Sequence, residues 1–300
     1  MSTHLTPSPG RRLRELLARK QILMAPGAFD ALSAKLIERA GFEAMYMTGG
    51  GTVTALAGLP DIGLLSVTEM ALNARYIANA VHTPVFADAD TGYGNALNVM
   101  RTVREYEQAG LAGLHMEDQV SPKRCGHVAG KECILLEEMA GKIRAAVAAR
   151  SDPDFVIIAR TDARAPLGFD EAVKRGRAYA AAGADVIFPE ALQTREEFAD
   201  YARAVRVPLL ANMAEFGKTP YLSASEFEDL GYAIVIYATS GLRVALRAME
   251  AFYAELKARG TQTGWLDRMF TRAELYELIG YSRYTEFERE FVGDATDPLA

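Results

Sequence analysis

The chain has 300 residues, half of them hydrophobic, which is enough to bury a large core as one big α/β domain or as two smaller ones. Its net charge of −6 argues against a broad basic surface for nucleic acid or for an anionic membrane, so a bound anion needs a local site. Two cysteines and no long apolar N-terminal segment argue against a disulfide scaffold, a signal peptide and a membrane span, and the expected location is the cytoplasm.

The predicted elements begin after a polar, proline-containing tail, residues 1–10, and an amphipathic segment at 11–20. Eight short apolar runs then predict strands. These runs are 21–25, 44–47, 85–88, 113–117, 155–159, 185–188, 207–211 and 233–237. The first strand is expected to stop at Pro26-Gly27, because proline and glycine interrupt regular structure.

Helical patterns follow the predicted strands. They cover 29–40, 66–80, 97–108, 136–149, 170–182, a segment opened at Thr194, a short segment opened at Ser223, and 240–257. Ser66, Thr194 and Ser223 each stand three residues before a glutamate, which is the pattern of a capping box. The run Thr48-Gly49-Gly50-Gly51 after the second strand is interpreted either as a plain turn or as backbone that approaches a carboxylate or phosphate closely.

Eight apolar strands alternating with helices predict a closed parallel (β/α)8 barrel of the TIM type over residues 11–258. An open, doubly wound sheet is the structural alternative. Residues 259–300 are predicted to form a C-terminal helical extension, with seven aromatic side chains between Trp265 and Phe291. So much apolar surface needs cover, either from a neighbouring subunit or from the chain's own barrel.

Polar residues follow the predicted strands. In barrels of this type the active site lies at the carboxyl ends of the strands. The polar residues expected there are Thr48, Asp88, Asp90, Glu117, Arg160, Glu190, Asn212, Thr239 and Ser240. Carboxylates that face one small space repel one another unless a cation lies among them, and hard oxygen ligands suit magnesium. Asp88, Asp90 and Glu117 are therefore predicted metal ligands, although an Asp-x-Asp pair alone is more typical of a solvated turn.

A long loop, 118–134, follows the fourth strand and is predicted to be a functional lid. It contains Lys123-Arg124-Cys125-Gly126-His127, a basic neighbourhood in which a thiol can transfer protons. Cys133, His82 and His115 are interpreted as structural residues.

Arg160 ends a buried strand, so it needs an acidic partner. The partner is either a substrate carboxylate or, as a structural ion pair, Glu190 or Asp162.

These residues carry a resemblance to a known family. The chain resembles the isocitrate lyase and phosphoenolpyruvate mutase superfamily, and in particular its 2-methylisocitrate lyase branch, from about Arg11 to Phe291. The most specific motif is the loop from Lys123 to His127. The supporting matches are Gly58-Leu59-Pro60-Asp61, Asp88-Ala89-Asp90, Glu117-Asp118-Gln119, Ala159-Arg160-Thr161-Asp162, Phe188-Pro189-Glu190 and Asn212.

The resemblance implies cleavage of a carbon–carbon bond in a 2-hydroxy di- or tricarboxylate. It implies Mg²⁺, which Mn²⁺ could replace, held by Asp88 and Asp90 directly and by Glu117 through water. Cys125 would protonate the product carbanion, and Tyr46 is the favoured base. The substrate-binding and remaining catalytic residues implied in this way are Thr48, Gly49, Gly50, Asp61, Arg160, Gly126, His127, Glu190, Asn212, Thr239 and Ser240. A homotetramer with C-terminal helices exchanged between subunits is also implied.

Some positions depart from the branch. Thr48 stands where serine is typical, and Tyr237-Ala238-Thr239-Ser240 differs from the usual Tyr-Pro-Leu-Ser. The phrases from Arg160 to Gly168 and from Gly217 to Pro220 resemble 2,3-dimethylmalate lyases more closely. The sequence therefore leaves the substrate open, and it leaves two other interpretations. One is an oxaloacetate decarboxylase or hydrolase, or a phosphonate-forming mutase, of the same superfamily; the other is a metal-binding protein without catalysis.

Overall fold

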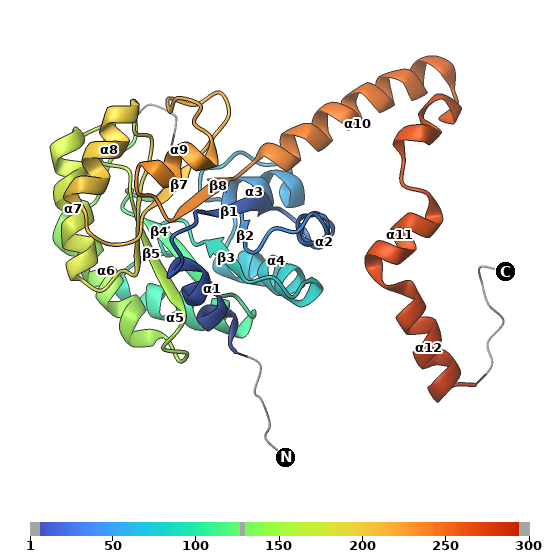
Figure 1. The fold of residues 1–300 in the computed structure, drawn as a ribbon, viewed down its shortest axis with the longest axis horizontal. Helices are drawn as coiled ribbons and strands as arrows, with labels where there is room; N and C mark the ends of the chain where they lie inside the picture. Colours follow the sequence, from blue (N-terminus) through green and yellow to red (C-terminus); the bar gives the residue numbers. More distant parts are fainter. Residues whose placement is uncertain (1–6, 127–129, 294–300) are drawn as a thin grey trace. The chain divides into compact units, whose positions relative to one another are not determined.

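The structure, a computed structural model, describes residues 7–126 and 130–293. The chain forms two compact units, Met1–Leu242 and Arg243–Ala300. Strands surrounded by helices make up the first unit (Figure 1). Among the described residues, no helix has the length and apolar character needed to cross a membrane.

Eight parallel strands form one sheet in the order β6-β5-β4-β3-β2-β1-β8-β7. They are β1 (Leu23–Ala28), β2 (Met45–Met47), β3 (Val85–Asp88), β4 (Gly113–Glu117), β5 (Val156–Thr161), β6 (Val186–Pro189), β7 (Leu210–Asn212) and β8 (Ile234–Tyr237). The two ends of this order meet through a parallel bridge between Ile187 and Leu209 and through a 3.0 Å hydrogen bond from the Ile187 amide to the Pro208 carbonyl. The sheet is therefore closed, which confirms the predicted (β/α)8 barrel against the open sheet.

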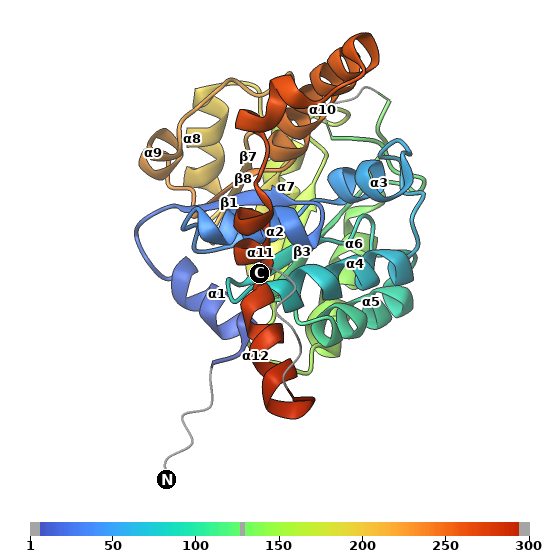
Figure 2. The same ribbon diagram turned by 90° about the vertical axis from the view of Figure 1, so that its right-hand side faces the viewer.

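The helices of this unit surround the strands, as the view turned by 90° shows (Figure 2). They are α1 (Pro9–Leu17), α2 (Ala31–Arg39), α3 (Gly49–Ala57), α4 (Val67–Ala80), α5 (Ala96–Gln108), α6 (Leu136–Ala149), α7 (Phe169–Ala181), α8 (Arg195–Ala204) and α9 (Ala224–Asp229). The predicted capping boxes at Ser66 and Ser223 open α4 and α9, and Thr194 caps α8 through a hydrogen bond from the Glu197 amide.

Side-chain alternation along the strands separates two cores. Met45 and Met47 point outward and pack in the layer between strands and helices, whereas Tyr46 points into the barrel with Phe86 and Phe188. The interior core also includes Leu13 and Leu16 of α1. Arg14 of the same helix donates to the Asp154 carbonyl just before β5, at 2.8 Å. Helix α1 therefore closes the amino-terminal end of the barrel and leaves the carboxyl ends of the strands for chemistry.

Two details differ from the sequence-based expectation. Strand β1 continues through Pro26 and Gly27 to Ala28, because Gly27 allows close backbone contact: a Cβ there would lie 2.0 Å from the Ala238 carbonyl oxygen. The glycine run after β2 is the first turn of helix α3, which was not predicted. The Thr48 hydroxyl caps that helix by accepting from the Gly51 amide, and burial of Val53 stabilises it despite the low helix propensity of glycine.

The second unit begins within α10 (Ser240–Arg259) and contains η1 (Thr263–Arg268), α11 (Arg272–Ile279) and α12 (Tyr281–Phe291). A capping box at Thr271 opens α11, with the Thr271 hydroxyl accepting from the Glu274 amide. Aromatic pairs stabilise the unit internally, with the rings of Phe252 and Trp265 5.6 Å apart and those of Tyr276 and Tyr281 4.5 Å apart. Exchange of these helices between subunits stays a prediction.

Candidate active site

A buried polar cluster lies inside the carboxyl end of the barrel, where Tyr46 of β2, Asp88 of β3 and His115 of β4 meet. The Tyr46 hydroxyl lies 2.7 Å from His115 Nε2 and donates to Asp88 Oδ2 at 3.2 Å. Burial lowers the pKa of His115 to about 4, so the imidazole is neutral at pH 7. Burial and the adjacent Asp88 raise the pKa of Tyr46 well above its ordinary value. The phenol is therefore protonated in the structure as described, and with its hydrogen directed at Asp88 its oxygen can accept from Nε2 of the neutral imidazole.

Asp88 and Asp90 lie beside a lysine ammonium. Lys123 Nζ is 2.8 Å from Asp90 Oδ1 and also contacts the Asp61 carboxylate. Although burial alone would lower it, these neighbours and Glu117 raise the pKa of Lys123 well above its ordinary value, so it carries a positive charge. Burial raises the pKa of Asp90 to about 6, whereas the surrounding positive charges outweigh burial at Asp88 and lower its pKa to about 2. The carboxylates at and just after the end of β3 thus lie in the field of a positive charge, that of Lys123.

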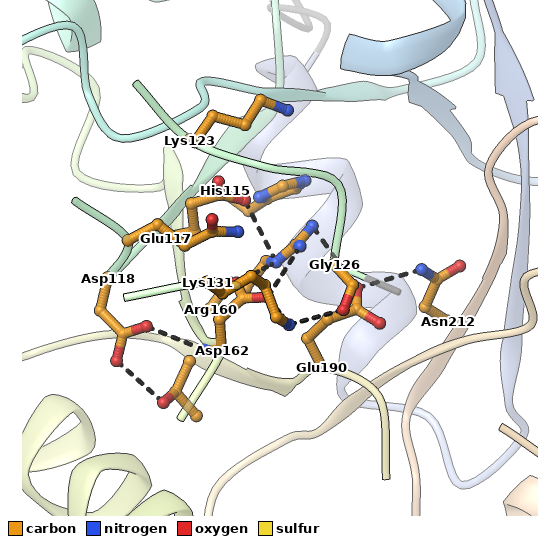
Figure 3. Close-up of polar contacts among 12 residues, drawn as sticks. His115, Glu117, Asp118, Lys123, Gly126, Lys131, Arg160, Asp162, Glu190 and Asn212 are labelled. Atoms are coloured by element: carbon orange, nitrogen blue, oxygen red, sulfur yellow. Dashed lines mark hydrogen bonds and ion pairs between the residues drawn. The ribbon is translucent and has the colours of Figure 1, made fainter. Parts of the chain in front are cut away.

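Arg160 of β5 lies at the centre of the other half of the site (Figure 3). Its Nε donates to Asp162 Oδ2 at 2.8 Å and lies 3.2 Å from Glu117 Oε2, and its Nη1 lies 3.4 Å from Glu190 Oε2. The Arg160 side chain is 9% exposed, and its carboxylate neighbours raise the pKa of Arg160 well above its ordinary value, against the effect of burial. Both structural partners considered from the sequence are in contact with Arg160, and a planar cation with five donors can still bind one further carboxylate.

The start of α3 forms one wall of the cluster. A Cβ on Gly49 would lie 2.2 Å from Asp88 Oδ2, and one on Gly50 would lie 3.0 Å from Asp61 Oδ2. Only glycine fits this close approach at residue 49. The first amides of a helix have no partner within the helix and carry the positive end of its dipole. The amino terminus of α3, capped by Thr48, is therefore directed at the carboxylates of the site.

The loop after β4 touches both halves of the cluster. Lys123 contacts Asp61 and Asp90, and Gly126 packs against Arg160 and Glu190, since a Cβ on Gly126 would lie 2.5 Å from Arg160 Nη2 and 2.7 Å from Glu190 Cγ. Cys125 is half-buried between these two anchors. The predicted catalytic residue His127 lies outside the described residues.

The remaining predicted residues lie at the end of β7 and just after β8. Asn212 Nδ2 donates to Glu190 Oε2 at 3.1 Å and so joins the half of the site around Arg160. The Ser240 hydroxyl instead donates to the Glu215 carboxylate. Thr239 precedes Ser240, just after the end of β8. The structure thus brings most predicted residues together and leaves Ser240 engaged with the loop after β7.

Three residues of the site, His115, Lys123 and Lys131, received no role of their own in the sequence-based analysis. His115 was read as structural, yet it contacts Tyr46; the signal was its spacing of two from Glu117, which puts both on the same face of a strand. Lys123 was seen only as part of the loop motif. Lys131 Nζ and Asp162 Oδ1 form a buried ion pair at 2.6 Å, which no local sequence pattern predicted.

The cluster suits a divalent metal ion by its chemistry. Glu117 is fully buried, and apart from the ion pair with Arg160 neither of its carboxylate oxygens accepts a hydrogen bond from any described residue. Burial accordingly raises the pKa of Glu117 well above its ordinary value. Within residues 7–126 and 130–293, no three acidic, histidine or cysteine side chains already converge as a metal cage. Mg²⁺ is commonly held by only one or two carboxylates plus water and substrate, so Asp88 and Asp90, with Glu117 nearby, fit it.

Comparison with known proteins identifies the family. The sequence matches the phosphoenolpyruvate phosphomutase family over residues 13–257. The chain belongs to this family. Two relatives named as carbon–carbon lyases are similar over nearly their whole length. The 2-methylisocitrate lyase of Aeropyrum pernix is 49% identical over 292 residues, 97% of this chain and 94% of that protein. The 2,3-dimethylmalate lyase of Eubacterium barkeri is 50% identical over 280 residues, 93% of this chain and 97% of that protein.

A solved structure agrees with the fold. Oxaloacetate acetylhydrolase in complex with 3,3-difluorooxalacetate aligns with a TM-score of 0.91 and 37% identity, covering 96% of this chain and 98% of that one. The resemblance noted in the sequence is thereby confirmed. This member of the family is an enzyme, and its class is that of the carbon–carbon lyases.

Proposed function

We propose that this family member is a Mg²⁺-dependent lyase that cleaves a 2-hydroxy di- or tricarboxylate and uses Cys125 as the proton donor. The candidate reactions are 2-methylisocitrate to pyruvate and succinate, or cleavage of a 2-alkylmalate such as 2,3-dimethylmalate. One observation carries the proposal. Lys123 contacts Asp61 and Asp90 on one side of Cys125, while Gly126 packs against Arg160 and Glu190 on the other, so the thiol belongs to a loop seated on both halves of the site.

Substrate recognition follows from the second half of the site. Arg160 would bind the keto-acid end of the substrate, because a buried guanidinium pairs well with a carboxylate. The Asn212 amide, oriented by Glu190, and the Gly126 backbone would receive the carboxylates of the other fragment. Thr239 and Ser240 would line the pocket for the variable substituent, where one methylene changes selectivity by only about 1–3 kcal/mol.

Bond cleavage begins with removal of the hydroxyl proton of the substrate. Tyr46 would take that proton as a phenolate, a form that its raised pKa allows only with help from a bound cation. The His115 imidazole at 2.7 Å would hold the phenolate oxygen by donating from Nε2. Mg²⁺ bound to Asp88 and Asp90 would supply Lewis acidity for the oxygen that develops negative charge. The amides at the start of α3, next to Thr48, add dipolar stabilisation of the same charge.

The electron pair of the broken carbon–carbon bond stays on the departing fragment, a carbanion stabilised by its adjacent carboxylate. Cys125 would donate its thiol proton to that carbon and then be reprotonated from solvent or from the loop. His127 is proposed to assist as its neighbour in sequence.

A coupled assay tests this function. Pyruvate release is followed with lactate dehydrogenase for 2-methylisocitrate, 2,3-dimethylmalate and oxaloacetate, while glyoxylate release from isocitrate is measured separately. The lyase proposal expects turnover of a 2-hydroxy acid that is lost with EDTA, restored by Mg²⁺ or Mn²⁺, and abolished by Cys125→Ala. Absence of turnover with all four substrates, in protein that binds Mg²⁺, would favour a non-catalytic metal-binding role instead.

Hydrolysis or decarboxylation of oxaloacetate, or phosphonate chemistry, is the alternative within the family. Similarity to oxaloacetate acetylhydrolase favours keeping the first of these under test. The enolate left by hydrolysis or decarboxylation of oxaloacetate could take its proton from water instead of a thiol, so oxaloacetate turnover that survives Cys125→Ala would support this alternative.

The assembly and location complete the proposal. We infer a cytoplasmic homotetramer in which residues 259–300 form an extension exchanged between subunits and residues 11–258 form the catalytic barrel. Of the tail expected at 1–10, Pro9 and Gly10 belong to helix α1. The aromatic residues from Trp265 to Phe291 support it, because they give the extension apolar surface to bury.

A further inference from the structure

The two limbs of the loop that carries Cys125 pair with each other at its base. The Val120 amide donates to the Glu132 carbonyl at 2.8 Å, and the Ile134 amide donates to the Asp118 carbonyl at 2.9 Å. Gln119 and Cys133 form an antiparallel bridge between these bonds. Because backbone hydrogen bonds fix the base of the loop, the side chains of this short ladder are available to bind other parts of the loop.

Gln119 uses its side chain to hold the backbone just before Cys125. Its Nε2 donates to the Arg124 carbonyl at 2.8 Å, and its Oε1 accepts from the Arg124 amide at 2.9 Å. The residue is 1% exposed. A buried side-chain amide with both functions satisfied by one residue reproduces a β-ladder contact, which fixes the position and direction of that peptide.

Lys131 holds the backbone just after Cys125. Its Nζ donates to the Gly126 carbonyl at 2.5 Å and to Asp162 Oδ1 at 2.6 Å, and Figure 3 shows the ammonium directed at both. Its side chain is 1% exposed and that of Asp162 is fully buried. Asp162 in turn accepts from Arg160 Nε at 2.8 Å. One carboxylate therefore ties the loop to the guanidinium proposed to bind the substrate.

We propose that Gln119 and Lys131 are positioning residues that clamp the backbone on either side of Cys125 and thereby set the direction in which the thiol delivers its proton. The inference rests on the proposed function of Cys125. Neither side chain needs to touch substrate, because both act on the peptides flanking the reacting residue. Misplacement of a reacting group by about 1 Å can reduce the rate about 100-fold, so the clamp acts mainly on kcat.

The test combines turnover with thiol reactivity. Lys131→Met and Gln119→Met remove the bonds at similar side-chain volume, and Lys131→Arg retains the charge and the donors. Lys174→Met is the matched control, because Lys174 is 68% exposed and pairs only with Glu171 among the contacts found in the described residues. Each variant is assayed for kcat and KM with its best 2-hydroxy acid, and for the rate of Cys125 alkylation by iodoacetamide. Digestion after Glu132 separates Cys125 from Cys133, and mass spectrometry then quantifies each thiol.

The clamp predicts that Lys131→Met lowers kcat about 100-fold with a much smaller change in KM and a severalfold faster alkylation of Cys125. Gln119→Met should move both quantities in the same direction, and Lys131→Arg should recover much of kcat. A purely structural role would lower the unfolding temperature but leave kcat per folded enzyme and Cys125 alkylation at the level of Lys174→Met, and that result would overturn the proposal.

Two further outcomes are decisive. If Lys131→Met does not fold, Gln119→Met on the opposite limb decides the question by the same two measurements. Turnover that survives Cys125→Ala would refute the proposed function, and alkylation kinetics would still report independently whether Gln119 and Lys131 hold the loop.

Discussion

Replacement of Gly126 by alanine tests the seating of the loop on the site. The added Cβ would lie 2.5 Å from Arg160 Nη2 and 2.7 Å from Glu190 Cγ. Non-bonded heavy atoms prefer separations of about 3.5–4.0 Å, so the loop or its neighbours must move by roughly 1 Å. Arg160 cannot give way freely, because Asp162 holds it by two hydrogen bonds in a buried setting.

The magnitude follows from that displacement. Overpacking of a buried contact costs about 1–3 kcal/mol, and each 1.36 kcal/mol on the barrier is about tenfold in rate. If the loop yields, Cys125 and the Gly126 carbonyl move away from Arg160 together. We therefore expect Gly126→Ala to lower kcat/KM about 100-fold, in line with the effect of a misplacement of about 1 Å, while the barrel stays folded.

The assay is pyruvate release at several substrate concentrations, with thermal unfolding recorded on the same preparations. Gly141→Ala is the matched control: it lies within α6, and a Cβ there meets only Arg144 Nη2, at 3.8 Å. Alanine in a helix interior is more stable than glycine by about 0.5–1 kcal/mol, so this variant should gain stability and keep its activity. Wild-type kcat/KM in Gly126→Ala would refute the close packing of the loop on Arg160 and Glu190.

Three further predictions concern charge, metal and assembly. Burial lowers the pKa of His115 from 6.5 to about 4. As the pH falls, the imidazole takes up a proton in the unfolded chain before it does so in the folded one, so the free energy of unfolding should fall by about 2 kcal/mol from pH 7.5 to pH 5. Urea titrations of metal-free His115→Gln should lack this part of the pH dependence. Mg²⁺ at about 100 times its Kd should stabilise the protein by about 2.7 kcal/mol and raise its unfolding temperature. Asp88→Asn should abolish that rise, whereas the control Asp229→Asn on α9 should keep it. An undiminished rise in Asp88→Asn would contradict the proposed metal ligands. Light scattering should give the mass of a tetramer for the full chain and a smaller mass after deletion of residues 259–300; an unchanged mass would exclude the extension from assembly.

The sequence predicted the barrel well because its signals are local. Strands buried on both faces are continuous apolar runs, and capping boxes such as the one at Ser66 mark helix starts by hydrogen bonds three residues apart. The predictions failed where a contact distant in sequence decides the conformation. Strand β1 continues through Gly27 because a residue without a Cβ can pack against the Ala238 carbonyl. Helix α3 begins with three glycines because its Thr48 cap and its buried Val53 stabilise it.

The site divides in the same way. Carboxylates at strand ends could be found because the fold fixes where strand ends meet. The contact of His115 with Tyr46, the ammonium of Lys123 between two aspartates and the pair of Lys131 with Asp162 depend on side chains that converge from 31 to 69 residues apart. No spacing within one segment carries that information.

The bridge that closes the barrel has a thermodynamic consequence. Among the described residues, a single bridge, Ile187 with Leu209 just before β7, joins β6 to the next strand, whereas other neighbouring strands share two or more pairs. The hydrogen bond from Asn212 to Glu190 crosses the same seam at the mouth. A carboxylate ligand bound there would hold β6 and β7 together more firmly, so ligand binding and the pairing of these two strands are linked equilibria. Protection of the Ile187 amide from solvent deuterium should then increase with ligand concentration, which makes this single amide a reporter of occupancy.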